Sequence, residues 1–171
     1  QVTVEVNESS VMVRDHGRGI PLDKVVAVAS KMNTGAKYDS KAFKKSVGLN
    51  GVGIKAVNAL STEFYIESVR DGQCKKVEFS CGEIVKEYDI MPSDEPNGTM
   101  VKFTPDASIF RDYIYREEFI VPLLKNYTFL NTGLAIHLNG KRFYSKNGLV
   151  DLLKENLTRD TLYPIIHLKG D

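Results

Sequence analysis

The sequence lacks long apolar runs, has few cysteines and histidines, and carries almost no excess charge. No stretch of its 171 residues is long and apolar enough to span a membrane, and no signal peptide opens it, so we expect no membrane partner. A formal net charge of +1 gives no argument for binding DNA through bulk electrostatics. Cys74 and Cys81 lack metal-ligand spacing and are interpreted as buried or half-buried free thiols. The three histidines are scattered, so they predict no metal cluster.

What is present fits an ordinary folded domain. With 42% hydrophobic and 26% charged residues, the chain can bury a sizeable core. It opens at residues 1–6 inside a strand-like segment, without an initiator methionine, so we expect it to be cut from something longer.

Apolar periodicity predicts a mixture of strands and helices. Alternation with period two predicts strands at residues 2–6, 11–13, 64–69, 76–79, 84–90, 100–103, 134–138 and 142–144. Helical spacing predicts helices at residues 22–32, 51–60, 113–130 (kinked or restarted at Pro122) and 149–157. A further strand is expected to begin at residues 163–166. Because strands and helices do not alternate strictly, the order favours an α+β sandwich over a doubly wound sheet.

The first candidate for chemistry is the segment RDHGRGIP at residues 14–21. Asp15 ends a strand, and two glycines after it let the backbone turn tightly and approach a ligand. A carboxylate only accepts hydrogen bonds, so it can receive the exocyclic amine of adenine but would repel the carbonyl of guanine. Taken alone, the segment fits a simple turn with an Asx hydrogen bond equally well.

The second candidate is GLNGVG at residues 48–53, immediately before a predicted helix. Glycines there leave backbone N–H groups exposed, which suits an anion such as phosphate. The segment lacks the Lys-Ser/Thr ending of a Walker loop, and no strand feeds it as in a Rossmann fingerprint. Alone, it also fits an ordinary loop and helix cap.

The third candidate is NGTMVKFTPD at residues 97–106, where the hydroxyl of Thr99 stands at the mouth of a strand. Alone, this segment fits a plain turn and strand. In their order and separations, however, the three segments together resemble the nucleotide site of the GHKL superfamily.

The closer resemblance within that superfamily is to bacterial type IIA DNA topoisomerase B subunits, those of topoisomerase IV and gyrase. GVGIKAVNALS at residues 51–61, VRDGQ at 69–73 and FLNTG at 129–133 are similar to elements of these subunits, and the similarity covers nearly the whole chain. VRDGQ and GLVDLL at 148–153 favour topoisomerase IV over gyrase. The resemblance implies a two-layer α/β sandwich of the GHKL (Bergerat) type, an α+β fold. Its mixed, mostly antiparallel sheet would carry helices on one face and lack its N-terminal helix.

The resemblance also implies roles for individual residues. Asp15 would bind the adenine amine, with a water molecule and Thr99 completing the contact, and Arg70 with Pro21 would form the rim where aminocoumarins bind. Residues 33–47 would form an ATP lid, although its lysines fit solvated charges equally well. The residues assigned to ATP are Asp15, Gly17, Ile20, Pro21, Lys37, Lys44, Gly48, Leu49, Asn50, Gly51, Val52, Gly53 and Thr99.

Four positions depart from the family pattern. His16 stands where Asn or Asp is common, and Val47 and Asn50 replace a glycine and a histidine of the frequent phosphate loop. Phe43 falls where many relatives carry a lid tyrosine, so we expect a hydroxyl contact to adenine to be lost. None of these changes removes the site.

The resemblance places the catalytic parts outside this chain. A general-base glutamate and a Mg²⁺-binding asparagine would lie on a helix upstream, and a lysine that reaches the γ-phosphate would lie downstream. Residues 1–160 would be the ATP-binding domain, and residues 161–171 the start of the transducer domain. Because hydrolysis requires a positioned, deprotonated water, we expect the isolated chain not to turn over ATP.

In the parent protein, a cytoplasmic, nucleoid-associated enzyme, ATP and Mg²⁺ would drive closure of a gate and passage of one DNA duplex through another. Its partners would be DNA, the topoisomerase A subunit and a second B subunit. The alternative is another GHKL protein, namely a histidine kinase, an Hsp90-like chaperone or a MutL-like repair ATPase. A non-catalytic interaction module, in which the glycines are only structural, is a third interpretation.

Overall fold

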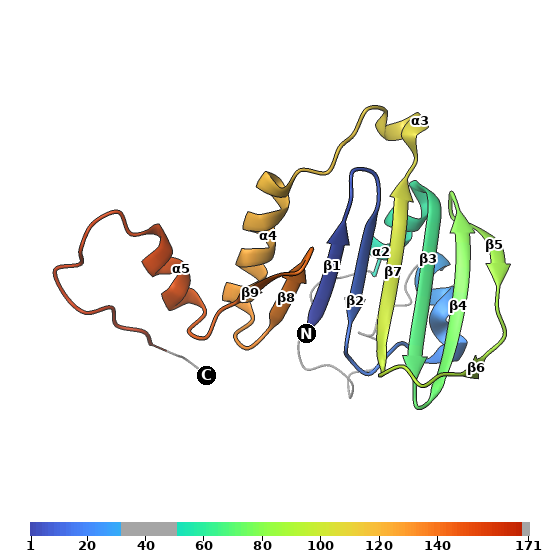
Figure 1. The fold of residues 1–171 in the computed structure, drawn as a ribbon, viewed down its shortest axis with the longest axis horizontal. Coiled ribbons are helices and arrows are strands. Elements are labelled where there is room, and N and C mark those ends of the chain that lie inside the picture. The colour runs from blue at the N-terminus through green and yellow to red at the C-terminus, as the bar shows by residue number, and fades with distance from the viewer. Residues whose placement is uncertain (32–50, 169–171) are drawn as a thin grey trace. The chain divides into compact units, whose positions relative to one another are not determined.

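The computed structural model describes residues 1–31 and 51–168 (Figure 1). These residues divide into two compact units: one spans Thr3–Tyr115, and the other contains Gln1–Val2 and the chain from Arg116 onward. The larger unit contains the following elements, of which only the first residue of β1 falls outside it. They are β1 (Val2–Val6), β2 (Val11–Asp15), the 3-10 helix η1 (Leu22–Lys24), α1 (Val25–Ser30), α2 (Gly53–Ala59), β3 (Ser61–Arg70), β4 (Gln73–Ser80), β5 (Glu83–Glu87), β6 (Met91–Pro92), β7 (Gly98–Pro105) and α3 (Ala107–Phe110).

The larger unit is built on one sheet with the strand order β5-β4-β3-β7-β2-β1, and β6 pairs with β4. The long strand β3 lies between β4 and β7 and pairs with both in antiparallel fashion. The same central residues of β3 therefore meet apolar partners on each side: Phe64 lies opposite Phe79 and Phe103, and Ile66 lies opposite Val77 and Val101.

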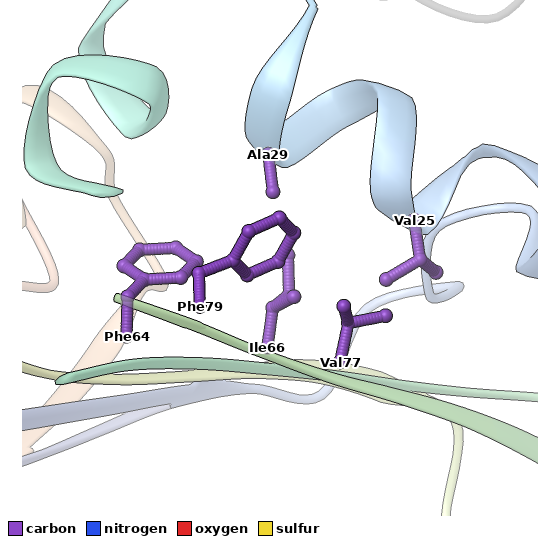
Figure 2. Close-up of a cluster of buried hydrophobic side chains, with 6 residues drawn as sticks. All are labelled: Val25, Ala29, Phe64, Ile66, Val77 and Phe79. Carbon is purple, nitrogen blue, oxygen red and sulfur yellow. The ribbon is translucent and has the colours of Figure 1, made fainter. Parts of the chain in front are cut away.

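The hydrophobic core lies on one face of this sheet, beneath the short helices. The rings of Phe64 and Phe79 meet edge to face, with centroids 5.8 Å apart. Helix α1 covers them, as Figure 2 shows, and Ile54 and Val57 of α2 pack against the same cluster. The buried cluster consists of Val25, Ala29, Phe64, Ile66, Val77 and Phe79. The helices therefore cover a single face of a mainly antiparallel sheet, which confirms the predicted α+β class.

The smaller unit contains α4 (Glu117–Leu130), β8 (Ala135–Leu138), β9 (Lys141–Tyr144) and α5 (Leu149–Asn156). Its hairpin turns at Asn139 and Gly140, whose φ angles of +47° and +85° are left-handed, as an Asn-Gly hairpin turn requires. The prediction of a strand beginning at residues 163–166 was wrong, because no strand forms there.

The helix predicted across Pro122 does form: α4 runs from Glu117 to Leu130 with Pro122 inside it, so no new helix starts at that residue. The kink at Pro122 stays a prediction. In the described ranges of the chain, no helix has the length and apolar character needed to cross a membrane.

Asp151 organises the start of α5. Its carboxylate accepts hydrogen bonds from the side chain and backbone N–H of Asn147, both at 2.9 Å, and from Ser145 Oγ at 2.7 Å. These bonds hold the pKa of Asp151 down to about 2. Because the folded-state pKa lies below its unfolded value, the stabilisation is complete above about pH 4 and is lost as the pH falls towards about 2.

We therefore expect Asp151→Asn to lower the melting temperature at neutral pH, and the difference from the unaltered protein to shrink as the pH falls from about 4 to about 2. Thermal unfolding followed by circular dichroism across this range checks the prediction, with the exposed Asp160→Asn as a control. A difference that stays constant with pH would contradict it.

Candidate functional site

Asp15 and Thr99 lie beside each other on adjacent strands. Asp15 is the last residue of β2, and Thr99 is the second residue of β7. Arg14 pairs with Met100 in the antiparallel register of β2 and β7. Continuing this register by one residue sets Asp15 opposite Thr99. Side chains two residues apart on a strand share a face, and Val101 packs against the core. Both polar side chains therefore lie on the face that α1 and α2 cover.

The carboxylate of Asp15 serves the turn that follows it. Its Oδ1 accepts the backbone N–H of Gly17 at 2.7 Å, which is the Asx turn anticipated from the sequence. Among the residues that the structure describes, the second oxygen accepts no hydrogen bond, and the side chain is half-buried. Oδ1 can therefore accept the hydrogen bond of the turn while Oδ2 of the same carboxylate accepts a hydrogen bond from a ligand.

Close backbone packing fixes this turn against β3 and β7. Gly19 has φ +72°, and a Cβ there would lie 2.4 Å from the carbonyl oxygen of Val69. A Cβ on Gly98 would lie 2.1 Å from the carbonyl oxygen of Asp15. In addition, Ser68 Oγ donates to the carbonyl of Ile20 at 2.8 Å. The strand ends thus approach closely where a side chain would not fit.

The other residues of the predicted base pocket lie at the same end of the sheet. Ile20 packs against the core cluster, and the exposed Pro21 precedes η1. Arg70 is the last residue of β3, and its Nε lies 3.4 Å from Asp71 Oδ2. Because Val69 pairs with Gly98, Arg70 stands at the strand end beside the entry to β7, as a rim residue would.

The described part of the glycine-rich segment forms an open turn into α2. Gly51 has φ +59°, Val52 caps the helix, and Gly53 is its first residue. A Cβ on Gly53 would meet no atom of the described residues within 4 Å, so its surroundings are open. The remaining residues of the predicted phosphate and lid positions lie outside the described residues: Lys37, Lys44, Gly48, Leu49 and Asn50.

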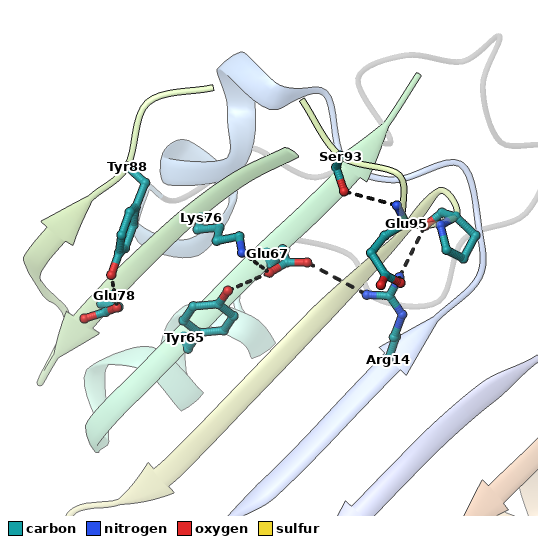
Figure 3. Close-up of polar contacts among 9 residues, drawn as sticks. Arg14, Tyr65, Glu67, Lys76, Glu78, Tyr88, Ser93 and Glu95 are labelled. Carbon is teal, nitrogen blue, oxygen red and sulfur yellow. Dashed lines mark hydrogen bonds and ion pairs between the residues drawn. The ribbon is translucent and has the colours of Figure 1, made fainter. Parts of the chain in front are cut away.

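A polar network behind Asp15 was missed by the sequence analysis. On the face of the sheet without helices, Arg14 donates to the carbonyl of Pro96 at 3.2 Å and lies 3.6 Å from Glu95 and 4.0 Å from Glu67 (Figure 3). Arg14 therefore ties β2 to the loop that leads into Gly98.

Glu67 is the buried centre of this network, since only 8% of it is exposed. It accepts the hydroxyl of Tyr65 at 2.6 Å and lies 3.3 Å from Lys76 Nζ. Burial, together with this hydrogen bond to Glu67, raises the pKa of Tyr65. A charged residue alternating with apolar ones on β3 was the available signal, but Arg14 and Lys76, the cations that pair with Glu67, lie on other strands.

The described residues offer no metal centre: within residues 1–31 and 51–168, no three His, Cys, Asp or Glu side chains group as metal ligands would. Both cysteines are free thiols, as predicted, and Cys74 is buried. Cys81 is exposed, so the burial predicted for it was wrong.

Comparison with known proteins gives strong relatives, although no family model matches the chain. It is 44% identical over 168 residues to the B subunit of DNA topoisomerase 4 from Borreliella burgdorferi, a match that covers 98% of this chain and 28% of that subunit. It is 32% identical over 180 residues to the B subunit of DNA gyrase from Helicobacter pylori, covering 95% of this chain and 23% of that subunit. The chain thus spans about a quarter of the length of these relatives.

Among solved structures, the fold is similar to the 43K ATPase domain of Thermus thermophilus gyrase B, crystallised in complex with an aminocoumarin. The TM-score is 0.76 at 26% sequence identity, and the match covers 95% of this chain and 45% of that one.

Proposed function

We propose that this chain, which belongs to the family of bacterial type IIA DNA topoisomerase B subunits, forms the part of such a subunit that binds ATP. The higher identity to a topoisomerase IV subunit than to a gyrase subunit supports a topoisomerase IV parent. Within it, ATP binding would bias one conformation of a gate and so drive passage of one DNA duplex through another.

The observation that carries this proposal is the half-buried carboxylate of Asp15, set opposite Thr99 and held in a turn without room for side chains at Gly19 and Gly98. The free oxygen of Asp15 would accept the exocyclic amine of adenine. Thr99 would complete the contact through a water molecule. The close packing of the glycines supports a rigid, preformed recognition edge.

Backbone N–H groups at residues 51–53 would bind the phosphates, because the turn is open and a left-handed glycine begins it. Two further parts of the phosphate site remain predictions. They are backbone contacts from Gly48, Leu49 and Asn50, and side-chain contacts from Lys37 and Lys44. Arg70 and Pro21 would form the rim for aminocoumarin inhibitors.

Other parts of the enzyme would complete the reaction. The described residues do not fit a Mg²⁺ site by themselves, so this chain would not hold the ion alone. The general base and the magnesium ligand would come from outside this chain, and its partners would be DNA, the A subunit and a second B subunit. Hydrolysis by this chain alone is therefore not expected.

Calorimetric titration of ATP and of GTP into the full-length subunit tests the proposal. Because a carboxylate accepts from the amine of adenine but repels the carbonyl of guanine, we expect ATP to bind at least about 100-fold more tightly than GTP. Asp94→Asn, which alters an exposed carboxylate in the loop before β7, should keep this preference. Equal affinities, or no binding of ATP, would refute the proposed function.

A further inference from the structure

The side chain of Lys55 connects the two short helices that cover the sheet. Its ammonium, on α2, donates to the carbonyl of Val28 at 2.8 Å and to the carbonyl of Gly51 at 2.6 Å. Val28 lies near the end of α1, and Gly51 lies in the turn that enters α2. One cation therefore holds both the end of the first helix and the turn before the second.

This arrangement suits the chemistry of an ammonium group. It has three donors and no acceptor, and carbonyls at the end of a helix lack partners within that helix. A cation near a helix C-terminus is also favoured by the helix dipole. Lys55 is half-buried, and this desolvation lowers its pKa. Partial burial of the charged ammonium therefore costs free energy, and the hydrogen bonds to the carbonyls of Val28 and Gly51 offset this cost.

Asn58, one turn further along α2, contacts the neighbouring carbonyl of α1. Its Nδ2 donates to Ala29 at 3.0 Å, and only 1% of the residue is exposed. Asn58 thus accounts for part of the packing between the helices. The contact that distinguishes Lys55 is the one to Gly51, which lies in the turn and not in α1.

That contact fixes the direction of a particular N–H group. In a planar trans peptide, the carbonyl oxygen of Gly51 and the N–H of Val52 point in opposite directions. When Lys55 holds the carbonyl, the N–H of Val52 points away from the ammonium. The conformation of Gly51, with φ +59°, is one that glycine adopts readily.

We propose that Lys55 is a positioning residue for the phosphates of the bound nucleotide: its ammonium holds the Gly51 carbonyl and so fixes the Gly51–Val52 peptide with the Val52 N–H facing the phosphates. This inference rests on the proposed function. It assigns to Lys55 no contact with adenine, whose partners come from β2 and β7.

Lys55→Met tests this role, because it keeps the aliphatic stem and removes the donors and the charge. In the full-length subunit, we expect the affinity for ATP to fall about tenfold and the affinity for adenosine to stay within about twofold. Lys55→Arg, which keeps charge and donors, should recover part of the loss. Lys24→Met, which alters a lysine on the neighbouring 3-10 helix with 63% of its side chain exposed, serves as the matched control.

Calorimetric titration of each variant with ATP and adenosine separates the outcomes. An unchanged ATP affinity in Lys55→Met would overturn the inference. An equal loss for ATP and adenosine would also overturn it, since a merely structural role weakens the whole site. If neither compound binds to the unaltered protein, the proposed function itself fails, and the inference with it.

Discussion

Replacing Asp15 with asparagine is expected to lower ATP affinity about 100-fold while leaving the fold intact. The reason lies in the two roles of the carboxylate. Oδ1 accepts the N–H of Gly17 at 2.7 Å, and an asparagine can make the same bond with its amide oxygen. The amide nitrogen would then take the place of the free oxygen, so a donor would face the donor amine of adenine. Calorimetric titration with ATP measures the loss, and thermal unfolding measures the fold.

Two further variants separate recognition from the turn. Asp15→Ala removes both functions, so it should lose ATP affinity and also some stability, because the N–H of Gly17 loses its acceptor. Asp94→Asn changes an exposed carboxylate and should change neither quantity. If Asp15→Asn bound ATP like the unaltered protein, Asp15 would be a turn residue only, and the adenine contact would have to come from elsewhere.

The sheet of the larger unit could be predicted where sequence alternation and turn chemistry agree. The hairpin of β3 and β4 was expected around Asp71 and Gly72, and these residues have the left-handed φ angles of +54° and +77° that a tight hairpin turn uses. Burial on one face follows the same alternation, with Phe64 and Ile66 in the core. Local signals sufficed here because these two strands are neighbours in sequence as well as in the sheet.

Predictions failed where distant contacts decide the structure. The helix expected from Tyr113 begins only at Glu117. Before it, the backbone N–H of Tyr115 donates to the carbonyl of Glu8 instead of to a carbonyl one helical turn earlier, and the hydroxyl of Tyr113 donates to the carbonyl of Ser9 at 2.8 Å. The short helix α3 (Ala107–Phe110) was missed, although Asp106 caps it by accepting the N–H of Ser108. The apolar residues Ile165 and Ile166, after Tyr163 and Pro164, suggested a strand, but a strand forms only with a pairing partner.

The candidate site shows the same division. Asp15, Thr99 and the glycines could be named from the sequence, since each lies in a short motif with a known resemblance. Arg14 and Lys55 could not, because each has a partner that is a main-chain carbonyl remote in sequence, Pro96 for Arg14 and Val28 for Lys55. A side chain that supports a site by binding a carbonyl remote in sequence leaves no recognisable pattern in the neighbouring sequence.

Gly19→Ala is expected to destabilise the larger unit by about 3 kcal/mol, the sum of a strained backbone and a steric overlap. The φ angle of +72° disfavours any residue with a Cβ, and that Cβ would lie 2.4 Å from the carbonyl oxygen of Val69. Relief requires the turn to move away from β3. Such a movement would break the hydrogen bond from Ser68 to Ile20, so ATP affinity should fall as well. Urea unfolding and calorimetric titration measure the two effects.

Gly72→Ala provides a matched control for this prediction. Gly72 has nearly the same φ, +77°, but a Cβ there would meet no atom of the described residues within 4 Å. It therefore carries the backbone strain without the overlap, and we expect a loss of about 1 kcal/mol and an unchanged ATP affinity. The difference between the two variants isolates the close approach of the Gly19 turn to β3. If both lost the same stability, the contact with Val69 would relax without cost, and Gly19 would be needed only for its backbone conformation.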